Sequence, residues 1–315
     1  MKYDFSVIVL CYNPDMGKLK RTLTSILMQQ DISFEIVVAD DGSKLNYVSQ
    51  LQEWFANNDF ADYKLVMNEQ NRGTVQNLLS ALEAASGKYC KNISPGDYLY
   101  DDKVLRYYYD CMEQEGLSVC FGRAAYYSYE ADKLVIYNRH NPVDLKVYRR
   151  KQYSKILRNY FWFRDYALGA CLAFELKAAK VYTQQISACV KYAEDTAVIA
   201  MLSAGERIGM LDKFAVWYEY GTGISSMANS KWNTIIFEEN KGVFRMLAEK
   251  DLLAKKTYAY HFEENSSNRY WNLLRKLVLY PPYFFFLLKA TWGMRSDKEY
   301  RLCEKEKLMK LLEKQ

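Results

Sequence analysis

Acidic residues stand at three places in this sequence where a carboxylate could do chemistry: Asp40-Asp41, Asp97 and the pair Glu194-Asp195. A carboxylate can accept a hydrogen bond from a ligand, hold a divalent cation or take a proton from a hydroxyl group. Each place also has a plainer interpretation, because Asp, Gly and Ser form turns and because acids stabilise helix N-termini. The elements around these residues therefore decide how they are interpreted.

The first hundred residues alternate between apolar runs and segments with helical spacing. The runs at 5–12, 34–39, 63–67 and 89–93 show little polar alternation, which is typical of strands buried on both faces. This order predicts an α/β fold with a mixed, mainly parallel, Rossmann-like sheet and flanking helices. Ligands of such sheets bind at the carboxyl ends of the strands. Asp41 and Asp97 each follow a strand, so we expect them at one edge.

The pattern changes in the second half of the chain. Residues 117–137 predict a tyrosine-rich hairpin that turns at 130–133, and small residues at 168–174 predict a further strand. A helix is expected to begin near Glu194-Asp195, followed by a last strand at 208–218 and a loop to Ser225. We therefore expect a catalytic domain over 1–225 and a helical, basic and aromatic extension over 226–315.

Six short motifs occur in a characteristic order: VIVLCYN (7–13), EIVVADDGS (35–43), NRG (71–73), GKY (87–89), SPGD (94–97) and ED (194–195). In this order and spacing they resemble the family 2 glycosyltransferases, inverting enzymes of the GT-A fold that take a sugar from a nucleotide donor. The likeness covers about seven-tenths of the chain. It implies a transferase of class EC 2.4, moving a hexosyl or N-acetylhexosaminyl group, and UDP is the nucleotide that the family favours.

The resemblance also implies roles for individual residues. Asp195 is similar to the catalytic base, which takes a proton from the acceptor hydroxyl, and Glu194 to a supporting acid. Nucleotide binding is implied for Asp41 and, around it, for Tyr12, Asn71, Arg72, Gly73, Gly96 and Ser225. The loop before Ser225 lacks the basic residue that the family usually has there. A turn at Asp40-Asp41, an exposed Arg72 and a helix-stabilising acid pair remain the alternatives.

Asp97 takes the position of the family's metal-binding aspartate, where two or three acids are usual. Here Ser94 and Gly96 replace the preceding acids and cannot supply carboxylate ligands. Because Mg²⁺ often binds through one or two carboxylates plus substrate phosphates, Asp97 could still hold Mg²⁺ or Mn²⁺ together with the donor diphosphate. Asp97 as a turn residue is the alternative.

Composition and charge limit the kinds of ligand and the cellular location that this protein can have. The net charge of +5 is mild, so nucleic-acid binding is not indicated. Seven cysteines without a CxxC pattern, and an N-terminus without a charged-then-apolar segment, favour a cytoplasmic location. The 12-residue apolar run at 277–288 is too short to span a bilayer. With its basic and aromatic surroundings, the region 268–295 predicts either a peripheral anchor on the inner face of the membrane or a helix packed on the catalytic domain.

These features lead to one main hypothesis and two alternatives. The main hypothesis is a bacterial glycosyltransferase that extends a lipid-linked glycan in cell-surface polysaccharide biosynthesis. The first alternative is a glycosyltransferase that acts on a protein acceptor. The second is a non-catalytic subunit that binds a sugar nucleotide, suggested by the reduced acid cluster at Asp97. Asp195 argues against the second alternative, because a binding protein does not need a base.

Overall fold

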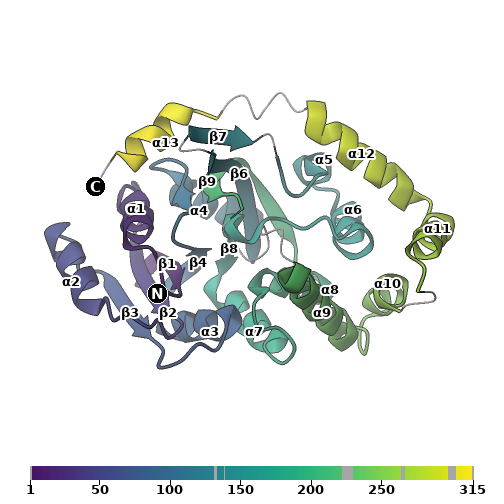
Figure 1. Cartoon of the computed structure of the whole chain (residues 1–315), viewed down its shortest axis with the longest axis horizontal. Helices are drawn as coiled ribbons and strands as arrows, with labels where there is room; N and C mark the ends of the chain where they lie inside the picture. Colours follow the sequence, from purple (N-terminus) through teal and green to yellow (C-terminus); the bar gives the residue numbers. More distant parts are fainter. Residues whose placement is uncertain are drawn as a thin grey trace.

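One mixed sheet forms the centre of the protein (Figure 1). The computed structural model describes residues 2–130, 133–137, 139–221, 230–263, 267–296 and 303–313, and within them nine strands join in the order β3-β2-β1-β4-β8-β6-β9-β5, with β7 paired to β6. The strands are β1 (Tyr3–Cys11), β2 (Phe34–Asp40), β3 (Tyr63–Met67), β4 (Gly87–Ile93), β5 (Tyr98–Leu99), β6 (Val119–Glu130), β7 (Lys133–Tyr137), β8 (Leu172–Glu175) and β9 (Ile208–Glu219).

The register of the first strands brings the predicted site residues to one edge. β1 pairs in parallel with both β2 and β4, with Cys11 opposite Asp40 and Val9 opposite Ile93. The DDGS and SPGD segments therefore leave the sheet at the same end, as expected. The second half is mixed, because β8 is antiparallel to β4 and β6, whereas β9 is parallel to β6. The predicted hairpin is confirmed by the antiparallel pairing of β6 with β7.

Helices cover both faces of the sheet (Figure 1). One face packs against α1 (Met16–Leu27), α2 (Val48–Asn57), α4 (Val104–Glu115) and α13 (Lys305–Leu312). The other packs against α3 (Thr74–Ala84), α5 (Leu145–Arg149), α6 (Tyr153–Arg158), α7 (Leu176–Ile186), α8 (Ala197–Ser203), α9 (Ser230–Leu247) and α10 (Leu252–Phe262). Short helical turns lie at η1 (Asn159–Phe163), η2 (Gly169–Cys171) and η3 (Glu194–Thr196).

Side chains of the central strand β1 alternate between the two hydrophobic cores, one on each face of the sheet. Val7 and Val9 of β1 belong to the core on one face, and Ile8 and Leu10 to the core on the other. Successive side chains of a strand point to opposite faces, so an uninterrupted apolar run fills both cores. The absence of polar alternation in the sequence follows directly from this double burial.

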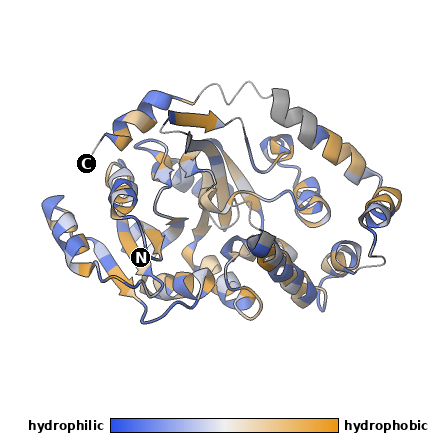
Figure 2. Ribbon diagram, in the orientation of Figure 1, coloured by the Kyte–Doolittle hydropathy of each residue, from blue (hydrophilic) through white to orange (hydrophobic). Residues whose placement is uncertain are grey.

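The C-terminal third consists of helices with different surroundings. Phe244 of α9 and Ala254 of α10 are buried in the same core as Ile8 of β1, and Leu308 of α13 is buried on the opposite face. By contrast, α11 (Arg269–Leu279) and α12 (Pro282–Ser296) run along the periphery (Figure 1) and contain many hydrophobic residues (Figure 2), several of which are exposed. The domain boundary expected at 225/226 stays a prediction, but α9 and α10 share the core of the sheet.

Aromatic contacts attach one side of α11 and α12 to the rest of the protein. Trp162 stacks on Tyr280 with 4.7 Å between the ring centroids, and Phe163 stacks on Phe286 at 4.4 Å. Lys289 forms a salt bridge of 2.5 Å with Asp144. Among the residues that the structure describes, no helix is both long enough and apolar enough to span a bilayer.

Candidate active site

Asp41 holds the loop that follows β3. Its Oδ1 accepts a hydrogen bond from the backbone N–H of Arg72 and its Oδ2 one from that of Gly73, each at 2.8 Å. Gly73 has a φ of +92°, and a Cβ there would lie 2.7 Å from the backbone oxygen of Lys191. A residue with a side chain therefore cannot occupy this position without strain. The loop is fixed beside the end of β2, where the resemblance implies nucleotide binding.

The neighbours of Asp41 divide into structural and exposed residues. Asp40 accepts hydrogen bonds from the Ser43 backbone at 2.7 Å and from the Tyr47 hydroxyl at 2.6 Å, so it holds the turn. Tyr12 is 50% exposed at the end of β1, which leaves its ring available to a base. The Arg72 guanidinium donates to Gln76 Oε1 at 3.0 Å and is exposed. Asn71 is likewise exposed in this loop.

Asp97 ends a tightly held turn. Gly96 has a φ of +101°, its carbonyl accepts from the Tyr127 hydroxyl, and its N–H donates to Thr22 Oγ1 at 3.2 Å. The Thr22 hydroxyl donates in turn to the Asp97 carbonyl at 2.9 Å. The Asp97 side chain is buried, and its Oδ1 accepts from the Glu219 N–H at 3.0 Å. Asp97 is thus placed by contacts from α1, β6 and β9.

Glu219 brings a second carboxylate to this turn. A Cβ on Gly96 would lie 2.5 Å from Glu219 Oε2, so the Glu219 carboxylate fills the space that a side chain at position 96 would need. Both Glu219 oxygens accept from Lys18 Nζ, at 2.6 and 2.7 Å. Burial raises the pKa of Asp97 to about 7; the hydrogen bond from the Glu219 N–H and the charges of Lys91 and Lys18 oppose this rise, and repulsion by the Glu219 carboxylate adds to it.

The chemistry of this donor set fits a cation that arrives with its substrate. Asp97 offers one carboxylate, while Glu219 is engaged by Lys18. In the ranges that the structure describes, no group of three or more His, Cys, Asp or Glu residues could hold a metal ion. A divalent cation at Asp97 would therefore need most of its ligands from phosphate oxygens and water, as is common for Mg²⁺.

Lys91 connects the Asp97 turn to the other half of the sheet. This side chain of β4 is fully buried, and its Nζ donates to the carbonyl oxygens of Asn92 and Ala170. Burial lowers the pKa of Lys91 to about 8, although the nearby Asp97 favours its charged form. Since Ala170 belongs to η2, Lys91 connects β4 to the turn that lies against Asp195.

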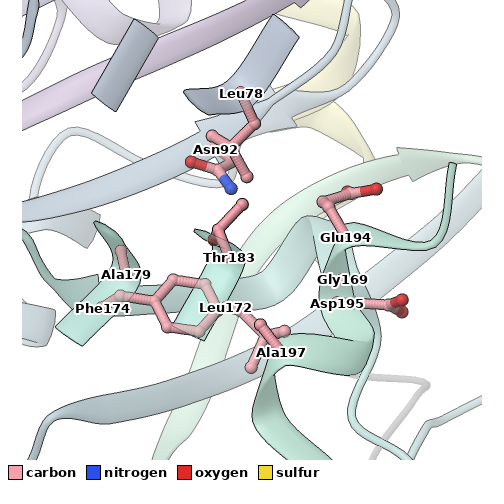
Figure 3. Close-up of a pocket in the computed structure, with 10 residues that line it drawn as sticks. All are labelled: Leu78, Asn92, Gly169, Leu172, Phe174, Ala179, Thr183, Glu194, Asp195 and Ala197. Carbon is pink, nitrogen blue, oxygen red and sulfur yellow. The ribbon is translucent and has the colours of Figure 1, made fainter. Parts of the chain in front are cut away.

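Glu194 and Asp195 begin the η3 turn that leads into α8. Their carboxyl groups point away from Phe174 and Thr183, which line a small pocket behind them (Figure 3). A Cβ on Gly169 would lie 3.2 Å from Asp195 Cβ, so η2 passes directly over the acid. Burial raises the pKa of both acids, and Glu194 is raised further by the Asp195 charge. A raised pKa suits a carboxylate that exchanges protons near neutral pH.

A continuous set of contacts joins the Asp41 loop to this acid pair. The N–H of Val75, at the start of α3, donates to the Lys191 carbonyl at 3.0 Å. Lys191 also lies against Gly73, whose N–H is held by Asp41. Residues 191–193 therefore connect the loop that Asp41 holds to the acid pair Glu194-Asp195, which follows directly in the chain.

Not every predicted site residue can be placed. Ser225 lies outside the described residues. Conversely, no motif assigned a role to Lys18, Lys91 or Glu219, which surround Asp97. Glu219 directly follows the strand predicted at 208–218 and Lys91 lies within another, so no local pattern distinguished them. The pairing of β9 with β5 brings Glu219 to the turn.

The family model described as glycosyl transferase family 2 matches residues 6–182, more than half of the chain. The chain belongs to this family. It is therefore a glycosyltransferase, EC 2.4, as predicted, and the non-catalytic alternative is set aside. No curated protein matches the sequence.

Solved structures agree with the GT-A fold of a family 2 enzyme. TarS from S. aureus (residues 1–349), in complex with UDP-GlcNAc, is 18% identical with a TM-score of 0.55, over 98% of this chain and 80% of that one. The same TarS fragment in complex with UDP has a TM-score of 0.52 at 18% identity, and the match covers 85% of this chain and 73% of the TarS fragment. The mannosyltransferase PcManGT from Pyrobaculum calidifontis, with GDP-Man and Mn²⁺, has a TM-score of 0.51 at 14% identity, over 95% and 88%.

Proposed function

We propose that this family 2 enzyme transfers a sugar from a UDP-sugar to a hydroxyl of a lipid-linked glycan, with inversion, in the assembly of a cell-surface polysaccharide. The observation that carries the proposal is the position of Asp195: a partly buried carboxyl group of raised pKa, at the same edge as the Asp41 loop and the Asp97 turn. The UDP and UDP-GlcNAc complexes of TarS support the choice of nucleotide.

The roles of the residues follow from their chemistry. Asp41 fixes the loop of Arg72 and Gly73 against the nucleotide, and the exposed Tyr12 ring packs on the base. Asp195 accepts the proton of the acceptor hydroxyl as its oxygen bonds to the anomeric carbon. The bond from that carbon to the diphosphate breaks on the opposite face, and the nucleoside diphosphate leaves with the bonding electrons. Attack from the face opposite the leaving group inverts the anomeric centre.

We further propose that Asp97 holds Mg²⁺ or Mn²⁺ together with the donor diphosphate. The Mn²⁺ in the PcManGT complex with GDP-Man supports this cofactor. A divalent cation at this position would offset the negative charge that develops on the departing diphosphate. Lys18, one-third exposed beside Asp97 and Glu219, is placed to add positive charge at the same end of the site.

A donor screen tests this function and the role of Asp97 together. With a panel of UDP- and GDP-sugars, the wild type is expected to release nucleotide only when Mg²⁺ or Mn²⁺ is present. Asp97→Asn is expected to lower turnover by about a hundredfold or more, because loss of the cation removes several kcal/mol of transition-state stabilisation. Mn²⁺ binding in the presence of UDP, measured by electron paramagnetic resonance, should weaken in parallel.

Asp102→Asn is the matched control, because Asp102 lies in the segment that follows the same turn. It should keep wild-type turnover and Mn²⁺ binding. Wild-type turnover in Asp97→Asn would show that Asp97 is only a turn residue, and no turnover of any donor by the wild type would contradict the proposed reaction.

The periphery of the protein supports a membrane-associated acceptor. Trp271, Leu274 and Val278 follow one another at helical spacing on α11 and are 62%, 48% and 70% exposed, and Phe285 of α12 is 68% exposed. Lone exposed apolar residues are common, but a group of this kind marks an interaction surface. We therefore propose that this apolar surface contacts lipid on the inner face of the cell membrane.

Replacing Trp271, Val278 and Phe285 by Ser is expected to abolish flotation with vesicles that contain an anionic phospholipid. The melting temperature should stay near that of the wild type, because these side chains are exposed. The matched control replaces Leu45 and Val181 by Ser, two residues that are 80% and 62% exposed elsewhere on the protein. Equal flotation of both variants would contradict the membrane contact and favour a protein acceptor.

A further inference from the structure

Glu239 of α9 makes an unusual set of contacts with the segment in front of the acid pair. Its Oε1 accepts from the Lys191 N–H at 3.0 Å, and its Oε2 accepts from the Ala193 N–H at 2.9 Å. The Tyr192 N–H between them lies 3.1 and 3.2 Å from the two oxygens. Three successive backbone donors thus converge on one buried carboxylate.

This segment has no regular secondary structure of its own. A buried backbone N–H needs a partner, and outside a helix or sheet a side chain has to supply it. The Tyr192 ring packs edge-on against Trp232, also of α9, with 5.0 Å between centroids. On its other side, the segment is bound by α3 through the Lys191 carbonyl. α9 and α3 therefore hold residues 191–193 from two sides, and Glu194-Asp195 follow at once.

We propose that Glu239 is a positioning residue of the active site: its carboxylate fixes the turn that aims Asp195 at the acceptor hydroxyl. This inference rests on the proposed role of Asp195 as base. It extends the functional part of the chain into α9, beyond the residues that the family model matches. The plainer alternative is a buried acid that only stabilises the packing of α9.

The charge of Glu239 has a second effect on the same site. Asp195 is faced by Glu194 beside it, by Glu239 of α9, and by the hydroxyls of Tyr160 and Tyr166. Burial is the main cause of the raised pKa of Asp195, and repulsion by Glu239 adds to it. Glu239 also contributes to the raised pKa of Glu194. Removing the Glu239 charge should therefore lower the pKa of Asp195.

Glu239→Gln tests the inference, since it removes the charge and places an amide donor against the three N–H groups. We expect kcat to fall by about tenfold to a hundredfold, because small misplacements of a catalytic group have effects of this size. The KM for the donor should change little. The acidic limb of the kcat profile should move to lower pH, and backbone amides of 191–193 should exchange faster with deuterium.

Two further variants separate positioning from general stabilisation. Glu238→Gln is the matched control, because Glu238 directly precedes Glu239 on α9, is more than half exposed and pairs with Lys241 of the same helix. It should leave kcat and amide exchange unchanged. Glu239→Asp keeps the charge on a shorter side chain, so kcat should fall while the acidic limb stays in place. It also serves if Glu239→Gln does not fold.

The outcomes distinguish this inference from the function on which it rests. Wild-type turnover in Asp195→Asn would overturn the role of Asp195 itself. An inactive Asp195→Asn, together with Glu239 variants that keep wild-type kcat, acidic limb and amide exchange, would overturn only the role of Glu239. A lowered melting temperature with unchanged kcat and pH profile would assign Glu239 to packing alone and overturn the inference in the same way.

Discussion

Asp195→Asn is expected to lower kcat by about 10² to 10⁴-fold, the range that a positioned general base contributes. Asn keeps the size of the side chain and can accept a hydrogen bond, but it cannot take the proton of the acceptor hydroxyl. Because the charged carboxylate is disfavoured by burial, the variant should melt no lower than the wild type. Donor affinity should also be unchanged, since the proposed nucleotide contacts are made by the Asp41 loop and not by Asp195.

The pH dependence of the wild type provides the complementary measurement. Only the deprotonated base is active, so the rate falls as the pH drops through the pKa of Asp195. The raised pKa of Asp195 places this loss above the pH at which an ordinary aspartate, with a pKa of about 3.9, would titrate. Glu194→Gln removes the acid beside Asp195 and should lower kcat less than Asp195→Asn. Wild-type kcat in Asp195→Asn, or a rate that is constant down to pH 4, would exclude Asp195 as the base.

Asp41→Ala is expected to weaken UDP binding by about tenfold to a hundredfold, with a much smaller effect on kcat. The substitution removes both hydrogen bonds that hold the backbone of Arg72 and Gly73, and a hydrogen bond to a charged group contributes about 1.5 to 3 kcal/mol. Part of that free energy would then have to be supplied by the nucleotide when it orders the loop. Isothermal titration calorimetry with UDP measures the change directly.

Asp41→Asn provides a graded comparison, because its amide oxygen can still accept one of the two hydrogen bonds. Its affinity should lie between those of the wild type and Asp41→Ala. Equal UDP affinity in all three proteins would show that the DDGS segment is a turn without a role in binding.

The fold and the family could be predicted from the sequence where they depend on residues that are close together in the chain. The double burial of β1 and β2 appears as uninterrupted apolar runs, and the parallel order that these runs predict places Asp41 and Asp97 at one edge. The membership in family 2 that the motifs indicated is confirmed by the family model. The individual roles of Asp41, Asp97 and Asp195 remain predictions, which the variants above test.

Sequence reasoning failed where distant segments meet. Glu239 lies in an ordinary amphipathic helix more than forty residues after Asp195, and only the packing of α9 on α8 brings it to the acid pair. The strand predicted at 168–174 begins at Leu172 instead, because residues 169–171 form the η2 turn beside Asp195. Small residues suit a strand and a close approach equally well, so the local pattern could not separate them.

The buried Lys91 limits how parts of this enzyme can be exchanged with those of its relatives. Its ammonium group depends on the carbonyl oxygen of Ala170, in a segment far along the chain. A chimera that keeps the first four strands but takes the segment around Ala170 from a relative must present a carbonyl oxygen at the same point. Otherwise the buried ammonium group loses one of its two carbonyl partners, and a hydrogen bond to a charged group contributes about 1.5 to 3 kcal/mol. The segments on the two sides of this contact can therefore be exchanged only if Lys91 and the turn that it binds are transferred together.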